Sequence, residues 1–390
     1  MRNHYTIIIL ILISSLVKLA CEEINFQKGN WEEIKALAAK SGKHIFLDAY
    51  TDWCGWCKVL DKETFTNKDV IEFVNANFIS VKYEMETGIG KTFAMKYRVR
   101  GFPSQLFFNP DGKLVFTGMG FAKPDVFIGT LKNAVNPEKQ INYKGITDDL
   151  NPPFPDFYKS AFEKNGSPEK KFPTDSMVYA YLNLQKDLFS EVNWSVISRF
   201  KTTYEYNDFF LEKMQTYSEL YGEDEVKEKL YSIVEDKLRQ AIEAENPDIW
   251  RDALHLASKY DPDGSQDKID YMEIMYYEKT SNWSEYARLI DIQINNNKMP
   301  PESINESAWT IYQNSKDPEV IKQAIGWMKS IIDKEPNWEW FDTYASLLYK
   351  NRDYKQAKKY ALMALEEGTK KKADVGETEK LLEKINSELK

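Results

Sequence analysis

The sequence predicts an α/β domain built on one central sheet, followed by an all-helical region. Between residues 24 and 135, short apolar runs of strand length alternate with segments of helical periodicity. Beyond residue 156 almost every segment has a helical period and strand signals disappear. The chain of 390 residues is also too long for one typical hydrophobic core, so we expect two domains.

Helix caps and turn signals divide the α/β region into elements. Asn30 and Glu33 have the spacing of a capping box, which predicts the start of a helix. Residues 44–50 (HIFLDAY) form an apolar run typical of a fully buried strand. Residues 109–112 (NPDG) give a strong turn signal between two short strands. The pattern predicts strands at residues 24–26, 44–50, 78–83, 103–108 and 113–118, with helices near 31–41, 57–64, 69–76, 91–97 and 124–134.

A proline-rich segment separates the two regions. The periodic pattern breaks after residue 135, and the break ends at residues 151–155 (NPPFP). We therefore expect an α/β domain over residues 21–137, a linker over 138–155 and a helical domain over 156–390. Within the helical domain, the amphipathic pattern predicts helix pairs near residues 268–294, 303–333 and 338–367.

The last predicted helix pair resembles the tetratricopeptide repeat. The positions that match the small and large residues of that repeat are Ala345, Tyr349, Tyr354, Ala357, Tyr360 and Ala364. The two earlier pairs depart from the pattern. The resemblance implies that stacked helix pairs form an extended surface that binds a protein partner.

The N-terminus has the features of an export signal. Arg2 supplies a positive charge, and residues 7–17 form an apolar run that is shorter than the roughly 20 residues needed to span a bilayer. We expect residues 1–20 to be removed as a signal peptide, and an uncleaved N-terminal anchor is the alternative. The segment Leu19-Ala20-Cys21 loosely resembles a bacterial lipoprotein cleavage box, which would lipidate Cys21 and anchor the chain to a membrane. Lys18, however, stands where that box has an aliphatic residue.

The charge of the chain argues against one class of partner. The formal net charge is −9, and the longest basic run is only residues 370–372. Nucleic-acid binding needs a basic patch or stripe that this sequence lacks. We expect no nucleic-acid partner.

The chemistry is expected at residues 53–58 (WCGWCK), which follow the buried strand and open a helix. A cysteine at a helix N-terminus is stabilised as a thiolate by unpaired backbone N–H groups and by the helix dipole. We therefore interpret Cys54 as the nucleophile and Cys57 as the resolving thiol. A zinc site would need further ligands, for which only His44 and His255 remain, and a static structural disulfide is the other alternative. We expect no metal, and no cofactor besides a redox-active Cys54–Cys57 disulfide.

Residues 24–135 resemble a thioredoxin-fold domain, and more narrowly the thioredoxin-like domains of periplasmic thiol–disulfide interchange proteins. The motifs that carry the resemblance are residues 46–50 (FLDAY), 52–58 (DWCGWCK), 63–65 (ETF), 100–104 (RGFPS) and 109–112 (NPDG). The resemblance covers under a third of the chain. It implies a central mixed sheet with flanking helices, and a thiol–disulfide oxidoreductase in the periplasm or cell envelope of a bacterium.

The resemblance also implies roles for single residues. Asp48 corresponds to a buried acid beneath the resolving cysteine, where a desolvated carboxyl can accept a thiol proton. Lys82 corresponds to a lysine that faces this acid. Pro103 corresponds to a cis-proline next to the cysteine pair. Lys58 ends the cysteine motif, and the implied substrate-binding residues are Trp53, Gly55, Trp56, Phe102 and Pro103.

One departure from the family pattern leaves the direction of the reaction open. Trp56 stands where typical thioredoxins carry proline, and residues between the two cysteines tune the reduction potential. The pair could therefore act as reductant, oxidant or isomerase.

We expect its partners to be cysteine-containing exported proteins, or a thiol donor of the membrane or periplasm. The alternative is a repeat-based scaffold protein with an accessory thioredoxin-like domain. The intact cysteine pair, with Asp48 and Pro103 in register, favours the enzyme.

Overall fold

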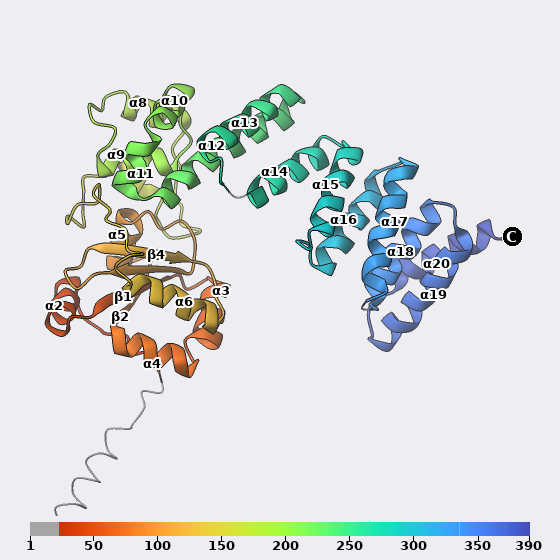
Figure 1. Cartoon of the computed structure of the whole chain (residues 1–390), viewed down its shortest axis with the longest axis horizontal. Helices are drawn as coiled ribbons and strands as arrows, with labels where there is room; N and C mark the ends of the chain where they lie inside the picture. Colours follow the sequence, from red (N-terminus) through yellow and green to blue (C-terminus); the bar gives the residue numbers. More distant parts are fainter. Residues whose placement is uncertain (1–22, 265, 335) are drawn as a thin grey trace, which may run out of the picture. The chain divides into compact units, whose positions relative to one another are not determined.

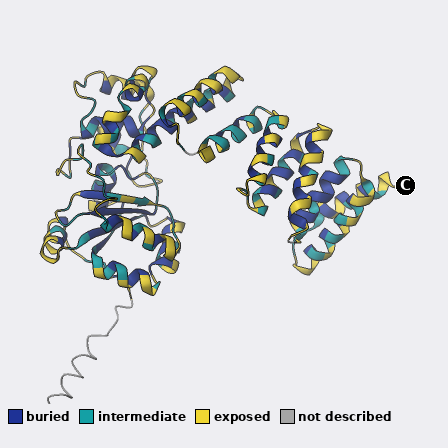
Figure 2. Cartoon of the chain, viewed as in Figure 1, coloured by how far each residue is buried: buried dark blue, intermediate teal, exposed yellow. Residues whose placement is uncertain are grey.

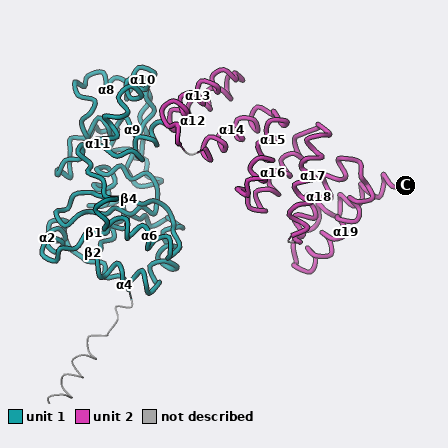
Figure 3. The backbone as a smooth tube through the Cα atoms, in the orientation of Figure 1, with its two compact units in different colours: residues 1–230 teal, residues 231–390 magenta. Residues whose placement is uncertain are grey.

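The computed structural model describes residues 23–264, 266–334 and 336–390 (Figure 1). The expected signal peptide and Cys21 lie outside these residues. Backbone contacts divide the chain into two compact units, Met1–Leu230 and Tyr231–Lys390 (Figure 3). The linker that the sequence predicts at residues 138–155 falls inside the first unit. The helices that follow it, up to Leu230, therefore belong to the same unit as the sheet.

A mixed four-stranded sheet organises the first unit, with the strand order β2-β1-β3-β4. Strand β1 pairs parallel with β2 and antiparallel with β3, and β3 pairs antiparallel with β4. The five residues 45–49 of β1 are buried, and four of them are apolar, as expected for a central strand; the fifth is the acid Asp48. The strands are β1 (His44–Tyr50), β2 (Phe78–Glu84), β3 (Ser104–Phe108) and β4 (Leu114–Met119).

Helices cover both faces of this sheet. Consecutive strand residues point to opposite faces and therefore pack against different helices. Phe107 packs in a core cluster with Phe127 and other apolar residues of α4 and α6, whereas Phe108 contacts the ring of Trp31 from α2. Phe93 of α5 also packs against Trp31, with ring centroids 4.9 Å apart. The helices around the sheet are α2 (Trp31–Ser41), α3 (Gly55–Val59), α4 (Lys68–Asn77), α5 (Gly88–Lys96) and α6 (Pro124–Val135).

The capping and turn signals are confirmed. Asn30 and Glu33 form the predicted capping box at the start of α2, and Gly42 closes that helix with a φ of 69°. In the predicted turn between β3 and β4, Gly112 has a φ of 82° and its N–H donates to the carbonyl oxygen of Asn109. A positive φ is a backbone conformation that glycine adopts far more readily than other residues. Glycines at helix ends and in turns can therefore be predicted from the sequence.

Three sequence-based predictions differ from the structure. Residues 24–26 form no strand, and only an isolated bridge joins Phe26 to Ser80. The helix predicted at 57–64 is α-helical only to Val59 and continues as a π-helix, η1 (Leu60–Thr64). The helix predicted at 91–97 begins earlier, at Gly88, so that Gly90 lies inside α5. A side chain there would place a Cβ atom 1.9 Å from the carbonyl oxygen of Glu84, so glycine permits the close approach of α5 to β2.

Beyond residue 155 the first unit is helical and is held to the α/β domain by buried ion pairs. Lys96 of α5 lies 2.7 Å from Glu191, with both side chains almost completely buried. Arg98 pairs with Glu225, and the Tyr158 hydroxyl donates to the carbonyl oxygen of Met95. These helices are α7 (Asp156–Ser160), α8 (Asp175–Leu182), α9 (Glu191–Arg199), α10 (Tyr204–Glu212), α11 (Met214–Tyr221) and the first part of α12 (Glu223–Glu243).

The second unit consists of helices whose facing sides are buried (Figure 2). Helix pairs α14/α15, α16/α17 and α18/α19 lie where the sequence predicts them, and Leu381 and Ile385 of α20 join their common core. Their assignment to the tetratricopeptide family stays a prediction. None of the helices in the described part of the chain is long and apolar enough to cross a membrane. The helices are α13 (Pro247–Tyr260), α14 (Gln266–Lys279), α15 (Trp283–Asn295), α16 (Pro301–Asn314), α17 (Pro318–Ile332), α18 (Trp338–Lys350), α19 (Tyr354–Lys370) and α20 (Gly376–Glu388).

Candidate active site

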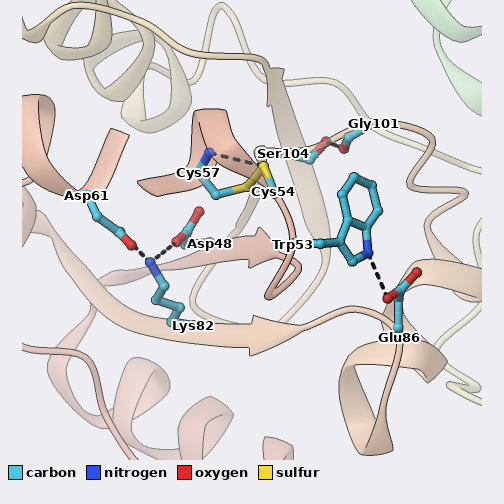
Figure 4. Close-up of a disulfide and its surroundings, with 9 residues drawn as sticks. All are labelled: Asp48, Trp53, Cys54, Cys57, Asp61, Lys82, Glu86, Gly101 and Ser104. Atoms are coloured by element: carbon cyan, nitrogen blue, oxygen red, sulfur yellow. Dashed lines mark hydrogen bonds and ion pairs between the residues drawn. A yellow bond between two sulfur atoms is a disulfide. The ribbon is translucent and has the colours of Figure 1, made fainter. Parts of the chain in front are cut away.

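A disulfide between Cys54 and Cys57 stands at the N-terminus of α3, with the two Cα atoms 5.3 Å apart (Figure 4). Cys54 is the N-cap residue, and its Sγ accepts a hydrogen bond of 3.0 Å from the backbone N–H of Cys57. Both cysteines are 4% exposed, so burial does not distinguish them. Their positions in the helix distinguish them, because of the two only Cys54 lies where the unpaired N–H groups at the start of α3 can stabilise a thiolate.

Asp48 is buried in β1 and is directed toward the disulfide in Figure 4. Its Oδ2 atom lies 2.9 Å from Nζ of Lys82, whereas its Oδ1 atom is buried without a hydrogen-bond partner. Burial raises the pKa of Asp48 to about 6, although the charge of Lys82 opposes this rise. The carboxyl group therefore changes protonation close to neutral pH, with one oxygen free to exchange a proton.

Lys82 connects Asp48 to a second acid that the sequence analysis missed. The strand register places Lys82 of β2 opposite Asp48, and its Nζ atom also contacts Asp61 of η1. Burial lowers the pKa of Lys82, but Asp48 and Asp61 outweigh this effect, so the pKa lies above its ordinary value. The spacing of Asp61 from Cys57, four residues along a helix, is a signal that could have identified it.

Two exposed tryptophans flank the disulfide. Trp53 and Trp56 are 53% and 62% exposed. The ring of Trp56 stacks on Phe121, and Trp53 meets Phe102 edge to face with ring centroids 5.9 Å apart. The indole N–H of Trp53 donates to Glu86 at 2.9 Å, a contact for which the sequence offers no signal.

The remaining predicted site residues lie in the same α/β domain. The peptide bond between Phe102 and Pro103 is cis. Ser104 donates a hydrogen bond to the carbonyl oxygen of Gly101 at 2.7 Å, and Figure 4 draws this loop on the Cys54 side of the disulfide. Gly55 and Lys58 are exposed on α3.

The residues considered for a zinc site are placed differently. His44 begins β1 and its Nε2 atom lies 2.8 Å from the side-chain amide of Gln140, while His255 is exposed on α13. No cluster of three or more His, Cys, Asp or Glu side chains suited to a metal ion occurs within residues 23–264, 266–334 and 336–390.

Comparison with known proteins identifies the fold of this region. A family model described as a thioredoxin-like domain matches residues 31–134, which contain the whole four-stranded sheet. Residues 31–134 form a thioredoxin-like domain. The match leaves most of the chain outside it, including all helices beyond residue 155.

Several known proteins are similar to this thioredoxin-like domain. The thiol:disulfide interchange protein DsbD of Yersinia pestis is 32% identical over 120 residues, which are 29% of this chain and 20% of the relative. The protein of the same name from Pseudoalteromonas atlantica is 29% identical over 107 residues, 27% of this chain and 18% of the relative. These matches thus span about a fifth of each relative's length.

A solved structure titled as a putative disulphide-isomerase from Bacteroides thetaiotaomicron is 31% identical. The alignment covers 30% of this chain and 96% of that one, with a TM-score of 0.28.

Proposed function

We propose that the chain is a thiol–disulfide oxidoreductase of the bacterial cell envelope that exchanges disulfides with exported proteins through Cys54 and Cys57. The observation that carries the proposal is the Cys54–Cys57 disulfide at the start of α3, with the unpartnered Oδ1 of Asp48 buried beside it. The thiol:disulfide interchange proteins that the thioredoxin-like domain resembles support the reaction type. The signal-like residues 1–20 support export.

The first step belongs to Cys54. In the reduced protein its thiolate attacks one sulfur of a substrate disulfide, so that a mixed disulfide forms and the second substrate sulfur leaves as a thiolate. The N–H of Cys57, which donates to Sγ of Cys54 in the oxidised state, is placed to stabilise that thiolate. The exposed rings of Trp53 and Trp56 offer apolar surface to the incoming chain.

The second step belongs to Cys57 and Asp48. The Asp48 carboxylate accepts the thiol proton of Cys57, and the resulting thiolate attacks Sγ of Cys54. The mixed disulfide breaks, the substrate leaves as a thiolate, and the Cys54–Cys57 disulfide forms. Two electrons have passed from the protein to the substrate, and the reverse sequence oxidises a substrate dithiol. The pKa of Asp48, about 6, suits a group that must both take up and release a proton near neutral pH.

The second unit is proposed to hold a protein partner. Its helix pairs bury one face against their neighbours and leave the opposite faces to solvent, as in helical repeat proteins that bind extended surfaces. Lipidation of Cys21 would keep both units at a membrane surface.

Cysteine variants test the proposal directly. The chain should catalyse reduction of a protein disulfide by dithiothreitol, and Cys54→Ser should abolish this activity because the attacking thiolate is lost. Cys57→Ser should instead accumulate mixed disulfides, since attack survives and resolution does not. Cys21→Ser, which removes the third cysteine of the chain, is the matched control and should retain full activity.

The role assignment is wrong if the reduced protein is alkylated faster at Cys57 than at Cys54. A measured reduction potential would decide the direction of the reaction, since thioredoxin lies near roughly −270 mV and a strong oxidant near about −120 mV.

A further inference from the structure

A pocket of about 280 Å³ opens beside Trp53 and Phe102, and we call it the side pocket. One wall comes from the thioredoxin-like domain. The other comes from the helical part of the first unit, namely residues 161–172 and Arg199 at the end of α9. Both walls belong to the same compact unit. The side pocket thus borders the active site with residues that lie outside the region matched by the family model.

The acids and one arginine of the side pocket are already neutralised within the protein. Glu86 pairs with Lys170, and Glu163 pairs with Lys91. Arg100 donates to a backbone carbonyl and lies 3.4 Å from Glu228. Each of these charges therefore has an internal counter-charge.

Arg199 is the exception among the charged residues that line the side pocket. Its guanidinium carbon lies 3.9 Å from the ring centroid of Phe162, but no carboxylate of the described chain forms an ion pair with it. Its Nε atom is buried without a hydrogen-bond partner. Burial lowers the pKa of Arg199; Tyr158 opposes this effect and the nearby Arg100 adds to it, so the positive charge is disfavoured in the protein alone. An arginine nevertheless stays charged in proteins, so this site lacks an anion.

We infer that the side pocket binds an acidic side chain of the protein substrate, close in sequence to the cysteine that reacts with Cys54. Arg199 supplies the guanidinium that receives the carboxylate, and Phe162 holds the guanidinium in place by stacking. Phe172, which is 64% exposed at the pocket, offers apolar surface to the rest of that side chain. The inference rests on the proposed function, because it concerns the substrates of the same cysteine pair.

The position and size of the side pocket favour a peptide side chain over a whole small molecule. Trp53 precedes Cys54 in the chain and Phe102 precedes the cis-proline, and both line the pocket, so a substrate bonded to Cys54 begins next to a residue of the pocket wall. An extended peptide advances about 3.3 Å per residue, which brings residues near the substrate cysteine within reach. A volume of about 280 Å³ lies just below the range of about 300–1,000 Å³ that is usual for complete small ligands.

The experiment uses the reduced full-length chain and a set of peptides. Each peptide carries one cysteine as a mixed disulfide with 2-thiopyridine. A single Asp is placed in turn at each of the four positions on either side of this cysteine. Each Asp peptide is compared with a peptide that has Asn at the same position. Release of 2-thiopyridone gives kcat/KM, and the Asp/Asn ratio at each position is the readout. We expect one or two positions at which Asp is preferred by about tenfold, the effect of one charge-assisted hydrogen bond.

Variants of the arginine test the assignment within each peptide pair. Arg199→Gln should bring the Asp/Asn ratio close to one, and Arg199→Lys should retain part of the preference because the charge remains. Lys164→Gln removes a cation from the same segment that does not line the pocket, and it should leave the ratio unchanged. Because each ratio compares two substrates of one variant, a loss of folded protein does not imitate the expected result.

Three outcomes overturn the inference. An Asp/Asn ratio near one at every position refutes it, provided that the peptides are reduced. A preference that survives Arg199→Gln assigns the carboxylate to another cation. A carboxylate preference seen only with the glutathione mixed disulfide, compared with its ethyl ester, identifies a small thiol rather than a protein as the ligand. If the wild-type chain exchanges with no disulfide at all, it is the proposed function that fails.

Discussion

Replacing Asp48 by Asn should make the oxidised protein more stable at neutral pH but not at acid pH. The pKa of Asp48 rises from 3.8 in the unfolded chain to about 6 in the folded protein. An acid with a raised pKa binds its proton more tightly when folded, so its contribution to stability is complete below pH 3.8. This contribution is lost as the pH rises through 6. A rise of about two pKa units corresponds to about 3 kcal/mol.

The variant cannot ionise at this position and should not lose that stability. The free energy of unfolding of Asp48→Asn, relative to wild type, should therefore increase by about 2 kcal/mol between pH 4 and pH 7, because part of the total is already lost at pH 4. Pulse proteolysis in urea, with detection of peptides from β1, measures the unfolding of this domain separately from the second unit. The same variant should slow disulfide exchange at pH 7 by about tenfold or more, because the proton acceptor for Cys57 is lost.

Asp61→Asn is the matched control, since it also removes one acid from Lys82 but leaves Asp48 able to ionise. This control should keep the loss of stability between pH 4 and pH 6. A stability difference between Asp48→Asn and wild type that is constant from pH 4 to pH 8 would show that Asp48 is not held with a raised pKa. The proton-transfer role assigned to it would then have no basis.

Two further predictions concern the junction between the thioredoxin-like domain and the helices that follow it. A fragment of residues 23–230 should unfold at a higher urea concentration than 23–150, because the shorter fragment lacks Glu191 and Glu225, the partners of Lys96 and Arg98, together with the helices that carry them. Urea unfolding of the two fragments checks this, and equal stability would contradict it. Glu86→Ala should free the indole N–H of Trp53 and accelerate its hydrogen exchange, as seen by NMR; an unchanged rate would mean that the bond contributes nothing.

Much of the thioredoxin-like domain was predictable because its determinants are local. The apolar run of β1, the capping box at Asn30 and the turn that ends at Gly112 each specify a backbone conformation within a few residues. The order and spacing of Cys54 and Pro103 then pointed to the site. The hydrophobic pattern did not predict the π-helix η1. Its apolar residues occupy the same positions as they would in a continued α-helix, so the pattern does not distinguish the two conformations.

The contacts that join the helical segment to this domain could not be predicted. Lys96 and Glu191 are 95 residues apart, and each reads from sequence as an ordinary surface charge. Charged residues are almost never fully buried unless they are paired, and a single sequence does not reveal the pairs. The same reason hid Arg199, which stacks on Phe162 but forms no ion pair with a carboxylate of the described residues.

The pairs Lys96–Glu191 and Arg98–Glu225 also impose an order of events on a chain that emerges N-terminus first. Both cations belong to the thioredoxin-like domain, and both acids follow roughly a hundred residues later. Until residue 225 has been delivered, the domain carries two cations that cannot be buried without their counter-charges. The surface around Lys96 and Arg98 therefore reaches its final packing only with the helical segment. During that interval Cys54 and Cys57 stand without the second wall of the side pocket, which residues 161–172 and Arg199 supply.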